Sequence, residues 1–167
     1  DHVRYLDELK HCGFNLTRTF SGTYFEMPGS FNILDNTLAP PARSYLGPWA
    51  RSDQSGAAGG GNKFDLTRWD EAYFARLKDF VAQAGKRGIV VELVLFCPLY
   101  DDKLWQVSPM RAANNVNGVG KIGRTEVFAL KEKALTEIQE AVTRKLVDEL
   151  REFDNVYFEV CNEPYFG

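Results

Sequence analysis

The fold expected for this chain is decided by the stretch Asn155-Val156-Tyr157-Phe158-Glu159-Val160-Cys161-Asn162-Glu163-Pro164. Its valines and aromatic residues favour a buried or half-buried β-strand. Pro164 has no backbone N–H for a sheet ladder and restricts Glu163 to extended geometry, so the strand should end there. We therefore expect Asn162 and Glu163 at the carboxyl end of a strand, where parallel α/β folds place their catalytic groups. The alternative is that Glu163 is an acid of a βα loop without a catalytic role.

Two further segments of the sequence predict strands. Residues 14–20 are rich in aromatic and β-branched residues and follow an amphipathic helix expected over residues 2–11. Residues 89–97 form a nearly continuous apolar run, which is typical of a parallel strand covered on both faces. Together with the strand over residues 155–162, these segments alternate with helices. Such alternation predicts parallel strands joined by right-handed crossovers.

Two more helices precede the second and third of these strands. Asp65 or Thr67 is expected to cap the first of them, which should end near Gly85. The second is long and amphipathic, with apolar residues at helical spacing from Leu135 to Leu150. Both helices are expected to pack on the parallel sheet.

Two long segments, residues 21–63 and 99–124, are expected to be loops. Both follow the carboxyl end of a strand, whereas the returns from helix to strand are short. Such elaboration of one rim is typical of a barrel with its active site on that rim. Aromatic residues in these loops suit the wall of a sugar-binding cleft, although each is equally suited to anchoring its loop on the core. These aromatic residues are Tyr24, Phe25, Phe31, Tyr45 and Trp49 in the first loop, and Tyr100 and Trp105 in the second.

Arg18 and Glu92 interrupt strands that are otherwise apolar. A buried guanidinium needs a partner, and Glu92 is one candidate for a structural ion pair. Alternation along the second strand places Glu92 on the same face as Val94 and Phe96. Asp101 and Asp102 lack the spacing of a calcium loop, and no Cys/His cluster has zinc spacing, so neither a metal nor another cofactor is expected.

The composition excludes several classes of partner. With 167 residues, 44% hydrophobic content and a net charge of −3, the chain suits one soluble domain rather than a nucleic-acid or membrane-surface binder. No apolar run approaches the roughly 20 residues of a membrane span, and no signal segment opens the chain. Its three cysteines, Cys12, Cys97 and Cys161, favour reduced, buried thiols and a cytoplasmic location.

The strand ending in Asn162-Glu163-Pro164, together with the order of the elements before it, resembles clan A glycoside hydrolases, the retaining (β/α)8 enzymes that include the cellulase-type family five. The resemblance runs from about helix one to strand four, with residues 155–164 as strand four. It implies that Glu163 is the general acid/base and that Asn162 holds the sugar 2-hydroxyl. It also implies that Arg18 supports the nucleophilic carboxylate. Under this resemblance the expected substrate-binding residues are Trp105, Trp49, Tyr100 and Tyr24.

A complete (β/α)8 barrel takes about 250 residues, so this chain is too short to be one. The expected fold is a partial (β/α)8 TIM barrel, a single half-barrel domain over residues 1–167 with parallel strands and long βα loops. The nucleophilic Glu of the family, on strand seven, has no counterpart here, so the chain alone is expected to be inactive.

The expected function is that of a retaining glycoside hydrolase fragment acting on β-linked glycans. Its expected partners are an oligo- or polysaccharide and either a complementary half-barrel or a second copy of the chain, because three strands would leave open edges. One alternative is a non-catalytic carbohydrate-binding or self-assembling half-barrel module. Another is a barrel of different function that shares the tripeptide by chance.

Overall fold

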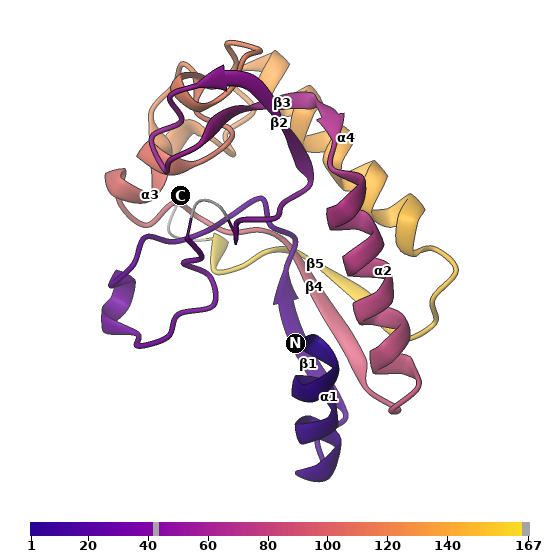
Figure 1. Cartoon of the computed structure of the whole chain (residues 1–167). Helices are drawn as coiled ribbons and strands as arrows, with labels where there is room; N and C mark the ends of the chain where they lie inside the picture. The colour runs from indigo at the N-terminus through magenta and orange to yellow at the C-terminus, as the bar shows by residue number, and fades with distance from the viewer. Residues whose placement is uncertain (42–43, 165–167) are drawn as a thin grey trace.

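The computed structural model describes residues 1–41 and 44–164 (Figure 1). Helices and strands alternate in the first and last parts of the chain, and a hairpin and several short helices lie between them. The elements are α1 (His2–His11), β1 (Leu16–Phe20), η1 (Ser30–Asn32), β2 (Trp49–Ser55), β3 (Asn62–Trp69), α2 (Glu71–Gly85), β4 (Val90–Phe96), α3 (Asp102–Val107), η3 (Ala112–Asn114), η4 (Arg124–Glu126), α4 (Lys133–Leu150) and β5 (Val156–Cys161).

Strands β1, β4 and β5 form a parallel sheet in the order β1-β4-β5. Helices α2 and α4 lie along one side of it, while α1 lies beside β1 (Figure 1). On β4, Val91, Leu93 and Leu95 are buried, whereas Val90 and Glu92 remain partly open to solvent. Two-residue alternation therefore gives the sheet one face in the core and one face that the described residues cover only in part.

The same C-terminal motif ends α1 and α2 and directs the chain into the next strand. Gly13 has a φ of 80°, and the Phe14 N–H donates to Leu9 O at 2.9 Å. After α2, Gly88 has a φ of 70°, and the Ile89 N–H donates to Ala84 O at 3.0 Å. Both are Schellman motifs, in which glycine takes the left-handed backbone that a side chain would oppose. These short returns bring β1 and β4 side by side in parallel.

The second sheet is an antiparallel pair, β2 with β3. These strands occupy the end of the segment expected to be a loop and the expected first turn of the next helix. The expectation that Asp65 or Thr67 caps α2 is wrong, because both residues lie in β3. The N-cap is Asp70, whose carboxylate accepts from the Ala72 and Tyr73 N–H groups at 3.0 and 3.2 Å.

The expected partial TIM barrel is wrong. The chain has a small mixed α/β fold that combines a three-stranded parallel sheet with a separate two-stranded antiparallel sheet. The alternation of helices and strands in the sequence predicted parallel strands. It does not determine how many strands the sheet has or whether the sheet closes into a barrel. Within residues 49–69, expected largely as an irregular βα loop, β2 and β3 form an antiparallel pair with register shifts instead.

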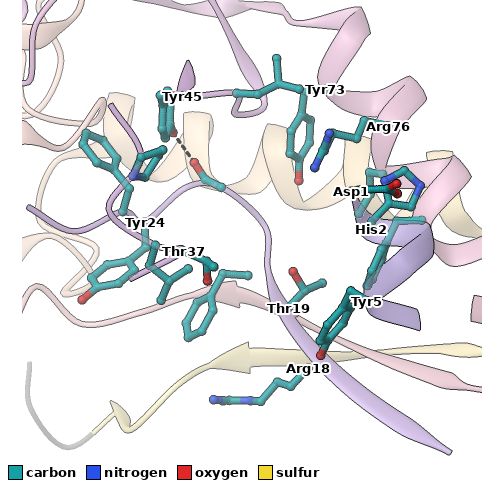
Figure 2. A pocket seen from close by; sticks show the side chains of 18 residues that line it. Asp1, His2, Tyr5, Arg18, Thr19, Tyr24, Thr37, Tyr45, Tyr73 and Arg76 are labelled. Atoms are coloured by element: carbon teal, nitrogen blue, oxygen red, sulfur yellow. Dashed lines mark hydrogen bonds between the residues drawn. The ribbon is translucent and has the colours of Figure 1, made fainter. Parts of the chain in front are cut away.

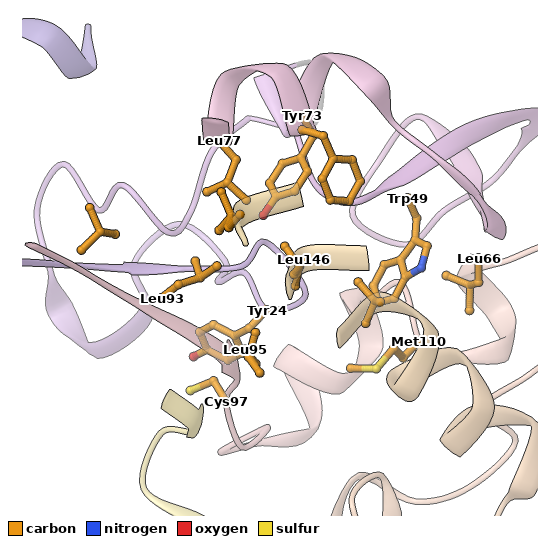
Figure 3. Close-up of a cluster of buried hydrophobic side chains, with 14 of the residues drawn as sticks. Tyr24, Trp49, Leu66, Tyr73, Leu77, Leu93, Leu95, Cys97, Met110 and Leu146 are labelled. Carbon is orange, nitrogen blue, oxygen red and sulfur yellow. The ribbon is translucent and has the colours of Figure 1, made fainter. Parts of the chain in front are cut away.

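The core extends from the parallel sheet to the hairpin (Figure 3). Leu77 of α2 and Leu146 of α4 belong to it beside Leu93, and Trp49 of β2 and Leu66 of β3 extend it beneath the hairpin. In residues 1–41 and 44–164, no helix combines the length and apolar character needed to span a membrane.

Candidate functional site

The polar cluster that includes Asn162 and Glu163 lies where β4 and β5 end. The Asn162 N–H donates to Phe96 O at 2.9 Å, which fixes the end of β5 beside the end of β4. Asn162 Nδ2 donates to the Tyr100 hydroxyl at 2.7 Å, and that hydroxyl donates to Glu163 Oε2 at 2.7 Å. Residues 62 and 63 positions apart in the sequence thus build one hydrogen-bonded cluster, because the carboxyl ends of neighbouring parallel strands meet at one edge.

Arg18 joins this cluster from β1. Its Nη2 donates to Asn162 Oδ1 at 2.8 Å, and its Nε donates to Glu159 Oε2 at 3.1 Å and lies 3.6 Å from Glu92 Oε2. Burial lowers the pKa of Arg18, but the hydrogen bond and charge of Glu159, with the charge of Glu92, outweigh it, so the pKa is raised. The expected pair with Glu92 is present, and Glu159 is a closer partner that the sequence did not indicate. The support of a nucleophilic carboxylate by Arg18 stays a prediction.

Tyr100 is half-buried and holds the centre of the cluster. Burial, followed by the hydrogen bond to Glu163, raises the pKa of Tyr100. The hydroxyl therefore stays protonated at neutral pH and donates a hydrogen bond to the carboxylate. The Cys97 thiol lies 3.6 Å from the same hydroxyl, and burial raises the pKa of Cys97. Tyr100 and Cys97 are therefore both neutral near pH 7.

The backbone at Glu163 differs from the expectation. Glu163 has a φ of 38°, in the left-handed region, and its side chain is exposed. The extended geometry expected before Pro164 is therefore wrong, and strand β5 already ends at Cys161. A non-glycine residue with this φ is uncommon, and backbone outliers of this kind gather at functional sites.

Three of the four expected substrate-binding aromatics lie in the core. The exposed fractions of Trp49, Trp105 and Tyr24 are 2%, 6% and 4%. The indole N–H of Trp105 donates to Ile122 O at 3.1 Å, in the loop before α4. In this structure these three rings present no face to solvent for a sugar. Tyr100 is the member of the set that reaches Glu163.

Of two further residues near the cluster, Glu26 was not singled out from the sequence, and Phe31 was named only as one of five aromatic residues in the first long loop. Glu26 is a buried carboxylate that accepts from the Tyr24 hydroxyl at 2.9 Å and from Asn36 Nδ2 at 2.5 Å. Phe31 is exposed, and its ring centroid lies 5.5 Å from that of Tyr100. An acid and an aromatic residue in a long loop carry no local signal that separates them from their neighbours, so only the fold reveals them.

A cavity of about 540 Å³ opens between β1, α2 and the segment after β1 (Figure 2). Arg18 and Tyr24 line it, but Asn162 and Glu163 do not. Its tyrosine hydroxyls already have partners: Tyr73 donates to Ser21 O at 2.6 Å, and Tyr45 donates to Gly22 O. Arg18 is therefore the residue that the cavity shares with the Glu163 cluster.

Within residues 1–41 and 44–164, no group of three or more His, Cys, Asp or Glu side chains is placed to hold a metal ion. The three cysteines are free thiols. Cys97 is buried and Cys161 is partly buried, whereas Cys12 is exposed, which differs from the expectation of buried thiols.

Comparison with known families gives a match over residues 36–163 to the model described as "Domain of unknown function (DUF6298)". The chain belongs to the DUF6298 family. No curated protein matches this DUF6298 chain.

The DUF6298 chain is similar to a solved structure of known source. It is a crystal structure at 1.80 Å resolution from Bacteroides vulgatus ATCC 8482, named "putative glycoside hydrolase", with a TM-score of 0.56 and 18% sequence identity. The match covers 99% of this chain and 26% of the other, so the DUF6298 chain spans about a quarter of that protein's length. At this identity the similarity concerns the fold, and membership of clan A or family five stays a prediction.

Proposed function

We propose that the protein containing this chain is a retaining glycoside hydrolase of β-linked glycans, with Glu163 as its general acid/base. One observation carries the proposal: the exposed Glu163 carboxylate follows a parallel strand and accepts a hydrogen bond from Tyr100 at 2.7 Å, beside an amide fixed by Arg18. The glycoside hydrolase name of the structurally similar protein supports it. So does the resemblance of Asn162-Glu163-Pro164 to the clan A motif.

Asn162 has the hydrogen-bonding capacity for a sugar hydroxyl. Its amide oxygen has two lone pairs, and Arg18 is the one described residue that donates to it. A second donor, such as the 2-hydroxyl of a pyranose, has a lone pair available there. The bonds to Arg18 and Tyr100 fix the plane of the amide before substrate arrives, and this preorganisation strengthens binding in the transition state.

Glu163 would act twice in a retaining reaction. It first gives its proton to the glycosidic oxygen as the bond to the anomeric carbon breaks, while a second carboxylate bonds to that carbon. It then takes a proton from the water that displaces the second carboxylate. Retaining enzymes hold the two carboxyl groups about 5–5.5 Å apart. The resemblance places the nucleophile on another strand, and we propose no residue of this chain for it.

The direct test is an assay of the full-length protein on a panel of β-linked glycans, with product stereochemistry followed by proton NMR. We expect release of sugar with retained anomeric configuration. Glu163→Gln should lower the rate by about 10²–10⁴-fold, the range that one general acid/base contributes. The exposed Glu152, on the segment after α4, provides the matched control Glu152→Gln, which should act like the wild type. Equal activity of the Glu163 and Glu152 variants would contradict the proposal.

A further inference from the structure

The segment after β1 brings an exposed aromatic ring to the Glu163 cluster. Phe31, in η1, is 56% exposed, and its ring meets that of Tyr100 nearly at a right angle, at 88° and 5.5 Å between centroids. The hydroxyl of Tyr100 in turn donates to Glu163. Tyr100 therefore connects Phe31 to the candidate acid/base, with its ring against Phe31 and its hydroxyl bonded to Glu163.

The backbone holds Phe31 in this exposed position against its own preferences. Phe31 has a φ of 55°, in the left-handed region that a bulky side chain opposes, and Asn32 and Asp35 share this backbone conformation with φ values of 56° and 53°. The exposed part of the ring also forgoes the stabilisation that burial of apolar surface would give. Strained backbone of this kind persists only where the surrounding structure fixes it, and such sites are often functional.

Hydrogen bonds at the base of the segment hold this strained backbone in place. The Glu26 N–H donates to Leu38 O at 2.6 Å, which closes the loop that carries Phe31. The buried Glu26 carboxylate accepts from Tyr24 and Asn36 at 2.9 and 2.5 Å. A buried carboxylate with both oxygens bonded is costly to disturb, so the loop is anchored at its base and presents its tip to solvent.

The site needs such a ring if its substrate is a sugar. A β-linked pyranose presents a face of C–H groups, and their positive polarisation matches the negative face of an aromatic ring. Trp49, Trp105 and Tyr24 are buried and present no such face to solvent. Phe14, which is 60% exposed, precedes the amino end of β1, whereas Glu163 follows the carboxyl end of β5.

We propose that Phe31 is the stacking platform for a pyranose ring of the glycan in the subsite next to Glu163. The proposal rests on the proposed function and adds to it the residue that binds the sugar face. In this arrangement Tyr100 connects the platform to the acid/base, since its ring packs on Phe31 and its hydroxyl bonds Glu163. Phe31 contributes to binding and leaves the proton transfer to Glu163.

The test is binding measured by calorimetry on the full-length Glu163→Gln protein, which removes turnover, with cellotetraose, xylotetraose and mannotetraose as probes. Phe31→Ala should weaken binding of the preferred probe by about 10- to 100-fold, whereas Phe31→Tyr should bind within a few-fold of the parent. Two controls change exposed apolar residues away from the ring contact: Phe14→Ala, and Leu34→Ala in the same loop, where Leu34 is 90% exposed. Both should bind like the parent.

Measurements of turnover distinguish the stacking role of Phe31 from the proposed function on which it rests. In the active protein, Phe31→Ala should raise KM with little change in kcat. If the wild type cleaves a β-glycan and Phe31→Ala binds it as well as the controls do, the stacking role is wrong and the proposed function stands. If the wild type neither binds nor cleaves any probe, both are wrong. If Phe31→Ala fails to fold, Phe31→Leu replaces it, and binding by Phe31→Leu equal to that of Phe31→Tyr overturns the stacking role.

Discussion

The hydroxyl of Tyr100 donates to Glu163 Oε2 at 2.7 Å and accepts from Asn162 Nδ2 at the same distance. Tyr100→Phe removes both bonds and keeps the ring that packs against Phe31 and Tyr24. A hydrogen bond to a charged group contributes about 1.5–3 kcal/mol, so we expect kcat of the active protein to fall about tenfold to a hundredfold. KM should change little, because the hydroxyl orients the carboxylate and the sugar-binding ring remains. A Tyr100→Phe variant with unchanged kcat would show that Tyr100 does not position Glu163.

Gly120 and Gly88 form a matched pair for testing the packing of the loop before α4. Both have positive φ, 87° and 70°, so alanine is strained at either position. A Cβ at Gly88 would meet nothing within 4 Å, whereas a Cβ at Gly120 would lie 1.8 Å from the backbone oxygen of Met110. Gly88→Ala should lower the unfolding free energy by about 1–2 kcal/mol. Gly120→Ala should lower it by more than about 3 kcal/mol, since backbone must move. Equal losses in urea unfolding would contradict this placement of the loop.

Glu149 links α4 to α2 and should make the stability pH-dependent. Its carboxylate oxygens lie 2.6 Å from Lys145 Nζ and 2.6 Å from Lys78 Nζ, and the hydrogen bonds from these lysines lower the pKa of Glu149. A carboxyl with a lowered folded-state pKa stabilises the fold above its unfolded value of 4.5, and this contribution is lost as the pH falls through the folded value.

Glu149→Gln should therefore be less stable than the wild type at pH 7, by about 1 kcal/mol or less for ion pairs near the surface. The difference in unfolding free energy between the two proteins should narrow below pH 4.5. It should vanish once Glu149 is protonated in both the folded and the unfolded state. Thermal unfolding followed by circular dichroism from pH 3 to 7 measures it. A difference that is constant across this range would mean that the two lysines contribute nothing to stability.

The elements that the sequence predicted well are those with strong hydrophobic periodicity. Residues 89–97 form an apolar run, and β4 lies within it with Val91, Leu93 and Leu95 buried. The helix expected over residues 2–11 has those bounds, because its apolar spacing and the glycine after it are local signals. Propensity and capping act within a few residues, and there sequence reasoning is strongest.

The hairpin was missed because its strands lack that signal. Strand β2 reads WARSDQS, which is mostly polar, and its pairing with β3 contains register shifts that disturb the alternation. Only Phe64 and Leu66, two residues apart and both buried, indicate a strand locally. A segment of this kind forms a strand because a partner lies beside it, and the sequence alone does not show the partner.

The site was predicted in part for the same reason. The positions of Asn162 and Glu163 follow from the end of a strand, which is a local feature. Their partners are distant in the chain: Arg18 reaches Asn162 across 144 positions, and Tyr100 reaches Glu163 across 63. The burial of Trp49 and the exposure of Phe31 are likewise outcomes of tertiary packing, which composition does not determine.

The measurement that tests the central claim most directly is the dependence of Glu163→Gln activity on the leaving group. The substrates are aryl β-glycosides whose phenols span a wide range of acidity, assayed with the full-length protein beside the Glu152→Gln control. Acid assistance matters most where the leaving oxygen is basic, so Glu163→Gln should lose far more activity on poor leaving groups than on activated ones. An equal loss on both would contradict the assignment of Glu163 as the general acid/base.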